Sequence, residues 1–139
     1  MKQLLAICLA VAALLAAPAG GATDSLAFSF GRKGGTIMPF QVQIFTSGRV
    51  VVTGAVRRIE PVTVSPEALA ALQKLAKAEG FFSMQPHTRC SETVAGLATS
   101  YIRVRIGKLD KTVSTYGRCN KRFLGLYDVL KAVAAVSTS

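Results

Sequence analysis

Apolar and polar residues alternate with a period of two in three stretches of the chain, at residues 26–30, 40–46 and 99–106. This period is typical of strands that bury one face. A Ser47-Gly48 turn and the run RVVVTG follow the second stretch, and a turn at residues 107–110 and the run 111–116 follow the third. The pattern therefore predicts one separate strand and two β-hairpins.

An amphipathic helix is predicted after each hairpin. Ser65 can cap the first helix, Pro66 suits its first position, and Gly80 is a natural end. Asn120 can cap the second helix, in which apolar residues recur at i, i+3, i+4 and i+7 from Phe123 onward. Residues 83–98 have no periodicity and are rich in turn formers, so we expect a long irregular segment there.

Two hairpins, each followed by a helix, predict an α+β fold. We expect a single antiparallel sheet of about four or five strands with both helices packed on one face. The other face of such a sheet can remain in water. The alternation assigns to that solvent face the polar and aromatic residues Gln41, Gln43, Tyr101, Arg103 and Arg105.

Residues 1–22 have the layout of a secretory signal peptide. Lys2 is followed by an apolar run over residues 4–17 and then by small residues, with cleavage expected after Ala22 or Ala19. The run is shorter than the roughly 20 residues that a transmembrane helix needs. We therefore expect an exported chain, periplasmic or secreted, with a single domain at residues 23–139 and no transmembrane segment in its mature form.

Signal cleavage removes Cys8 and leaves Cys90 and Cys119, an even pair in an oxidising compartment. The simplest prediction is a disulfide between them. The alternative is a metal site made of His87, both thiolates and Glu92. Structural zinc usually has four cysteine or histidine ligands, and the single histidine leaves that pattern incomplete, so we expect no metal.

The charge indicates what kind of partner to expect. Lys2 is one of 17 Lys and Arg residues, so cleavage leaves 16 against 7 acidic residues, a net charge of +9. Anionic partners such as lipid headgroups, lipopolysaccharide, cell-wall polymers or nucleic acid then become plausible. The candidate anion-binding residues are Arg103 and Arg105 on the solvent face, and Arg118, Lys121 and Arg122 around Cys119 and the second helix start. The alternative is that these charges only keep the sheet soluble and discourage edge pairing.

No catalytic set is recognisable in the sequence. There is one histidine, and there are no paired carboxylates at a familiar spacing, no nucleophile elbow and no strand–glycine loop–helix unit. We therefore expect neither an enzyme nor a bound cofactor.

The order of elements resembles a family of small exported bacterial domains of unknown function. The likeness lies in residues 40–54, in the helix that runs into Gly80-Phe81-Phe82, and in the hairpin TSYIRVRIGKLDKTVSTYG before the last helix. The resemblance implies the same architecture and carries no activity.

Together these observations favour an exported, non-enzymatic binding or accessory domain that applies its basic surface to an anionic envelope component or partner. The alternative is a small secreted inhibitor or protein-interaction module that uses the disulfide-fixed residues 83–98. Nucleic acid is not the expected ligand of an exported chain, and the oligomeric state stays open.

Overall fold

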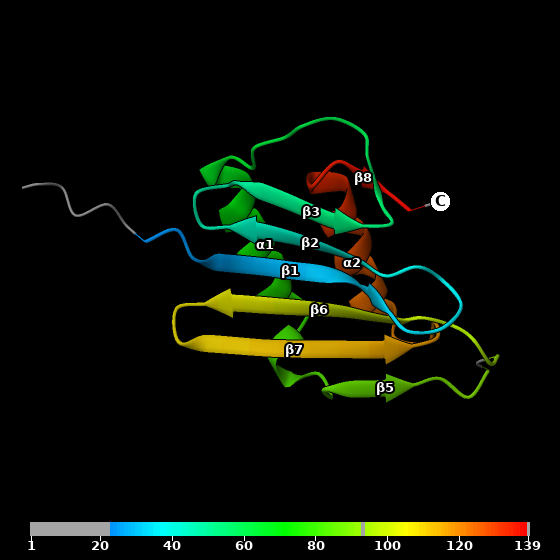
Figure 1. The fold of residues 1–139 in the computed structure, drawn as a ribbon. Coiled ribbons are helices and arrows are strands. Elements are labelled where there is room, and N and C mark those ends of the chain that lie inside the picture. The colour runs from blue at the N-terminus through cyan, green and yellow to red at the C-terminus, as the bar shows by residue number, and fades with distance from the viewer. Residues whose placement is uncertain (1–22, 93, 139) are drawn as a thin grey trace, which may run out of the picture.

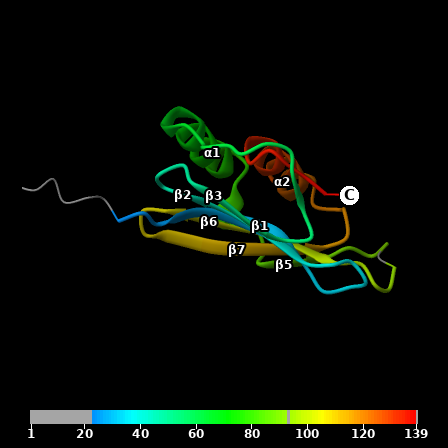
Figure 2. The same cartoon turned by 45° about the horizontal axis from the view of Figure 1, so that its top comes forward.

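A computed structural model describes residues 23–92 and 94–138 of the chain (Figure 1). The predicted signal peptide, residues 1–22, lies outside the described residues. A mostly antiparallel six-stranded sheet forms one layer, and two helices cover one of its faces (Figure 2). The predicted α+β class, with both helices on one side, is confirmed.

The large sheet has the strand order β3-β2-β1-β6-β7-β5. Its strands are β1 (Leu26–Lys33), β2 (Phe40–Phe45), β3 (Val50–Gly54), β5 (His87–Arg89), β6 (Thr99–Ile106) and β7 (Leu109–Tyr116). All neighbours are antiparallel except β5, which runs parallel to β7. Strand β1 lies between the two predicted hairpins, β2-β3 and β6-β7, and joins them into one sheet.

The predicted number of strands was too low. Strand β5 lies within residues 83–98, which the sequence presents as irregular, and β4 (Arg57–Arg58) and β8 (Val136–Ser137) form a separate two-stranded sheet. These strands have two or three residues each, too few for a period of two to emerge. Their pairing partners are distant in the sequence, so no local pattern signals them.

The two predicted helices form where their caps place them. They are α1 (Pro66–Ala78) and α2 (Lys121–Val133), with a short 3₁₀ turn, η1 (Phe81–Ser83), after α1. The Ser65 side chain accepts a hydrogen bond from the Ala68 N–H at 3.1 Å, and Asn120 does the same for Phe123. Gly80 has φ +66°, a left-handed conformation that ends α1 and turns the chain back to the sheet.

The core fills the space between the sheet and the helices. Its largest fully buried apolar side chains come from both layers: Phe28, Phe30, Val42, Ile44, Ile102, Val104, Val113, Phe81, Phe123, Leu126 and Leu130. None of the helices in the described part of the chain is both long and apolar enough to cross a membrane.

Candidate anion-binding face

The sheet surface that faces away from α1 and α2 is called the open face here. One cross-strand row runs over all six strands, through Thr53, Gln41, Gly31, Tyr101, Ser114 and His87. The residues of this row are small, polar or aromatic, as the alternation predicts. A shallow depression of about 400 Å³ lies over the centre of the face, with Tyr101, Gln43 and Arg103 among its lining residues.

Tyr101 stands at the centre of the open face. Burial raises the pKa of its phenol, while hydrogen bonds with Ser29 and Gln41 partly oppose that shift. The Gln41 amide also donates to the Ser29 hydroxyl at 3.1 Å. The phenol therefore remains protonated near neutral pH, and these three side chains present a connected set of neutral hydrogen-bonding groups.

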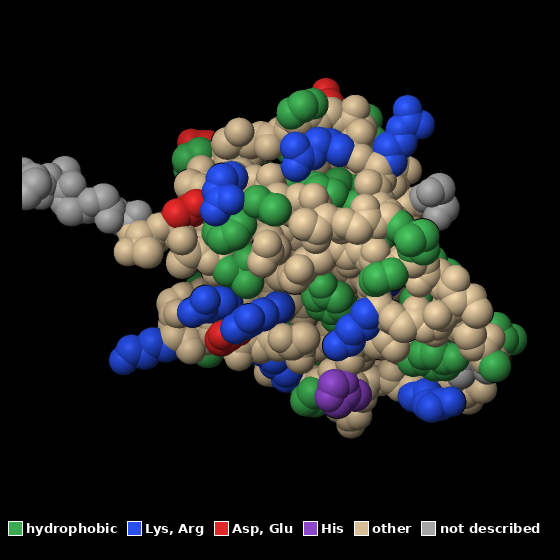
Figure 3. Space-filling view, in the orientation of Figure 1, with side chains coloured by type: hydrophobic (Ala, Val, Ile, Leu, Met, Phe, Trp, Pro, Cys, Tyr) green, Lys and Arg blue, Asp and Glu red, His purple; other side chains and the backbone are tan. Residues whose placement is uncertain are grey.

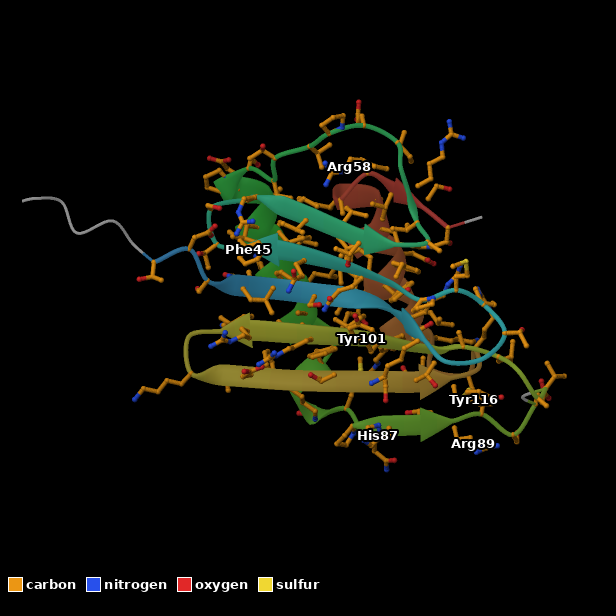
Figure 4. The ribbon with its side chains drawn as sticks, viewed as in Figure 1. Phe45, Arg58, His87, Arg89, Tyr101 and Tyr116 are labelled. Atoms are coloured by element: carbon orange, nitrogen blue, oxygen red, sulfur yellow. A yellow bond between two sulfur atoms is a disulfide. The ribbon has the colours of Figure 1, made fainter. Side chains whose placement is uncertain are left out.

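Three aromatic side chains, Phe45, Tyr101 and Tyr116, cross the open face on a diagonal (Figure 4). Each has a cation over its ring. The guanidinium carbon of Arg49 lies 3.9 Å from the ring centroid of Phe45, and that of Arg89 lies 5.1 Å from Tyr116. The Lys33 ammonium lies 5.8 Å from the ring centroid of Tyr101. We call these the three cation–aromatic pairs.

The pairs extend over most of the face. Phe45 and Tyr101 are two strands and four residues apart in the register, and Tyr101 and Tyr116 are one strand and two residues apart. With ~4.8 Å between strands and ~3.4 Å per residue, the diagonal measures about 25 Å. Figure 3 shows apolar patches along this diagonal with a basic side chain beside each.

Arg103 and Arg105, two of the predicted anion-binding residues, share one carboxylate. Arg103 binds Asp110 through two hydrogen bonds of 2.9 and 2.8 Å, and Arg105 Nε lies 3.4 Å from the same side chain. The hydrogen bonds from Arg103 hold the pKa of Asp110 below its usual range, and the same contact raises the pKa of Arg103. These two arginines lie on the open face, but an internal partner neutralises half of their charge.

The other predicted residues, Arg118, Lys121 and Arg122, lie apart from this pair. Arg118 follows the end of β7 opposite to its Asp110 end, and β7 is about 27 Å long at ~3.4 Å per residue. Lys121 and Arg122 are exposed in the first turn of α2. The structure thus divides the predicted anion-binding residues between two ends of the molecule.

The open face keeps an excess of positive charge after its ion pairs are counted. Arg49 also pairs with Asp24, with 3.2 Å between Nε and the carboxylate. The net charge of the open face is therefore +3. It comes from five cations (Lys33, Arg49, Arg89, Arg103 and Arg105) and two carboxylates (Asp24 and Asp110).

The disulfide between Cys90 and Cys119 is present, as predicted, with a Cα–Cα distance of 5.6 Å. The Cys90 N–H donates to the Tyr116 carbonyl at 2.9 Å, so the bridge fixes the end of β5 beside β7. His87, the first residue of β5, is exposed, and its Nδ1 lies 2.6 Å from the Ser114 hydroxyl. Within residues 23–92 and 94–138, no carboxylate forms an ion pair with His87 and no group of three potential metal ligands occurs.

Sequence reasoning found the position of Tyr101 and missed the cation–aromatic pairs. Phe45 and Arg49 stand on either side of the Ser47-Gly48 turn, and that spacing could have indicated their contact. Lys33 and Tyr101 are far apart in the sequence, so only the β1-β6 register brings them together.

No protein-family model matches the sequence, and no curated protein is significantly similar to it. The site must therefore be interpreted from its own chemistry.

Proposed function

We propose that this chain is an exported, non-enzymatic binding domain whose open face holds an anionic polysaccharide of the cell envelope. The observation that carries the proposal is the diagonal of three cation–aromatic pairs, Arg49 with Phe45, Lys33 with Tyr101 and Arg89 with Tyr116. The signal-peptide pattern of residues 1–22 supports export.

An aromatic ring under a cation restrains a side chain that would otherwise be mobile. Exposed cation–π contacts contribute about 0.5–1 kcal/mol each, enough to favour one orientation of the cation. Less side-chain entropy is then lost when an anion binds. A row of such cations suits an extended polymer with repeated negative charges better than a single small ion.

The neutral groups between the cations favour a polysaccharide over a lipid surface. Gln41, Gln43 and Thr112, which are partly or fully exposed, supply hydroxyl and amide groups on the open face. Such groups match sugar hydroxyls, which are both donors and acceptors. A membrane-binding face would instead need apolar side chains that enter the acyl region.

The decisive experiment compares two variants that each lose three charges. The first, K33Q/R49Q/R89Q, removes the cations of the three pairs. The control, R57Q/K74Q/K77Q, removes three exposed cations that lie outside the open face and outside the predicted anion-binding set. Binding to heparin, a soluble anionic glycan probe, is measured by calorimetry over a range of salt concentrations.

We expect the first variant to bind at least about tenfold more weakly at low salt and to lose most of its salt dependence, because the face falls from +3 to neutral. The control should bind like the native protein. Equal weakening in both variants would mean that net charge alone drives binding. Tighter binding to single-stranded DNA than to the glycan, or insensitivity to both triple substitutions, would contradict the proposal, and the second result would favour a protein partner at residues 83–98.

A further inference from the structure

Arg32 is a charged residue on the core side of the sheet. It continues the inward row of Phe28 and Phe30, which are fully buried, and pairs in the register with Phe40 and Ser100. Its guanidinium carbon lies 5.2 Å from the Phe40 ring centroid. A charge in such a row destabilises the fold unless a partner compensates for its lost hydration.

Arg32 as a whole is half-buried, and one of its donors has no partner in the described part of the chain. Its Nε–H is buried and makes no hydrogen bond there, and no carboxylate of those residues forms an ion pair with it. Of the side-chain nitrogens and oxygens in residues 23–92 and 94–138, it is the only buried one without a hydrogen-bond partner. Buried donors in native proteins are nearly always paired, so this one calls for an explanation.

A cavity of about 250 Å³ lies beside Arg32, between the end of the sheet and α2. Its polar side chains are Arg32, Ser100, Arg118, Tyr127, Asp128, Lys131 and Thr138. The space equals that of about eight water molecules in the liquid, at ~30 Å³ each, which is below the range of about 300–1,000 Å³ for pockets that take drug-sized ligands. The cavity therefore suits a compact charged group.

The charge of the lining indicates which group fits. The lining has three cations (Arg32, Arg118 and Lys131) and one carboxylate (Asp128), so its net charge is +2. Asp128 pairs with Lys131 at 3.2 Å. A phosphate monoester carries close to −2 and offers several strong acceptor oxygens, whereas a carboxylate carries only −1. Burial raises the pKa of Tyr127 to about 12, so its phenol remains a hydrogen-bond donor in this cavity.

We propose that this cavity is a phosphate-binding site, in which the Nε–H of Arg32 donates to the anion and Arg118 and Lys131 supply the remaining positive charge. Arginine suits this role because its donors form a planar fork that matches phosphate oxygens. Arg32 also lines the depression of the open face, but Arg118 and Lys131 do not, so R118Q separates this proposal from ligand binding at the open face.

The test is calorimetric titration of the oxidised protein with inorganic phosphate at constant ionic strength. We expect saturable one-to-one binding in the native protein, at least about tenfold weaker binding in R32Q, and several-fold weaker binding in R118Q. The matched control is R57Q, which removes one exposed charge elsewhere and should bind like the native protein. Phosphate should also raise the Tm of the native protein and leave that of R32Q unchanged.

Glycerol 3-phosphate distinguishes the two sources of the same group. Binding at least as tight as that of inorganic phosphate would assign the site to a phosphorylated headgroup, and much weaker binding would assign it to the free ion. Equal weakening by R32Q and R57Q, no saturable binding, or equally tight binding of acetate would each overturn the proposal. If R32Q does not fold, unchanged binding in R118Q would count against it.

Discussion

Loss of the Cys90–Cys119 disulfide should destabilise the domain and detach one edge of its sheet. The bridge closes a segment with a sequence separation of 29 residues. The loop-entropy model, ΔS ≈ −2.1 − 1.5R ln n, then gives about 3.6 kcal/mol at room temperature for that separation. This is a large part of the ~5–15 kcal/mol that stabilises a typical domain.

The effect should also be local. Strand β5 has three residues, and the Ser114 N–H to Pro86 carbonyl bond (2.8 Å) and the Cys90 N–H to Tyr116 carbonyl bond (2.9 Å) flank its pairing with β7. Such a short edge strand has little stability without the bridge, so it should open below the global transition. Opening would also separate Arg89 from Tyr116 and remove one of the three cation–aromatic pairs.

The measurement is urea unfolding of the oxidised protein, the reduced protein and the C90A/C119A variant, with amide hydrogen exchange of Thr88 and Ser114, whose N–H groups face the boundary between β5 and β7. The reduced protein shows the effect of losing the cross-link alone. The alanine variant also loses the packing of the buried Cys90 side chain. A loss of stability under about 1 kcal/mol on reduction, with unchanged exchange in β5, would refute the entropic reasoning.

Three further predictions follow from contacts described by the structure. A Cβ at Gly31 would lie 2.1 Å from a main-chain oxygen of β2, so G31A should cost about 1–3 kcal/mol in urea unfolding, whereas Gly125, in α2, has open space and G125A should stabilise by about 0.5–1 kcal/mol. Equal effects would contradict this contrast. D110N should free Arg103 and Arg105 and tighten heparin binding at low salt. Because the pKa of Asp110 is lowered, the native protein should lose a little stability as pH falls from the ordinary aspartate pKa, near 4, through that lowered pKa, and D110N should not show this loss. Weaker heparin binding by D110N would refute the prediction. Because the pKa of Tyr127 is raised to about 12, the native protein should lose stability as pH rises from about 10 to 12, and Y127F should lose less, a difference that pH-dependent unfolding can detect.

The sequence predicted the elements that local patterns determine. Both hairpins have alternation and a turn, and both helices have a capping residue and an apolar stripe, so their positions depend on neighbours within a few residues. Strand β5 was missed because its parallel pairing with β7 depends on the disulfide and on contacts across the sheet.

The candidate sites were predictable only in part. The alternation correctly predicted that Tyr101 and Arg103 lie on the solvent face of the sheet. It could not predict that Asp110 forms ion pairs with both Arg103 and Arg105. Arg32 illustrates the opposite limit. Its place in the alternation puts it on the core side with Phe30, yet its charge suggests solvent, and only the packed structure shows that its Nε is buried.

The two edges of the large sheet differ from the long bare edges that lead proteins to aggregate. At one edge β5 offers only three residues. At the other, the Arg58 guanidinium donates to the Val50 carbonyl at 3.2 Å (Figure 4). The main chain of Arg49 also pairs with that of Thr63 in an isolated antiparallel β-bridge. Little main chain therefore remains for strand addition by a second copy. A chain with such edges is expected to resist growth into fibres.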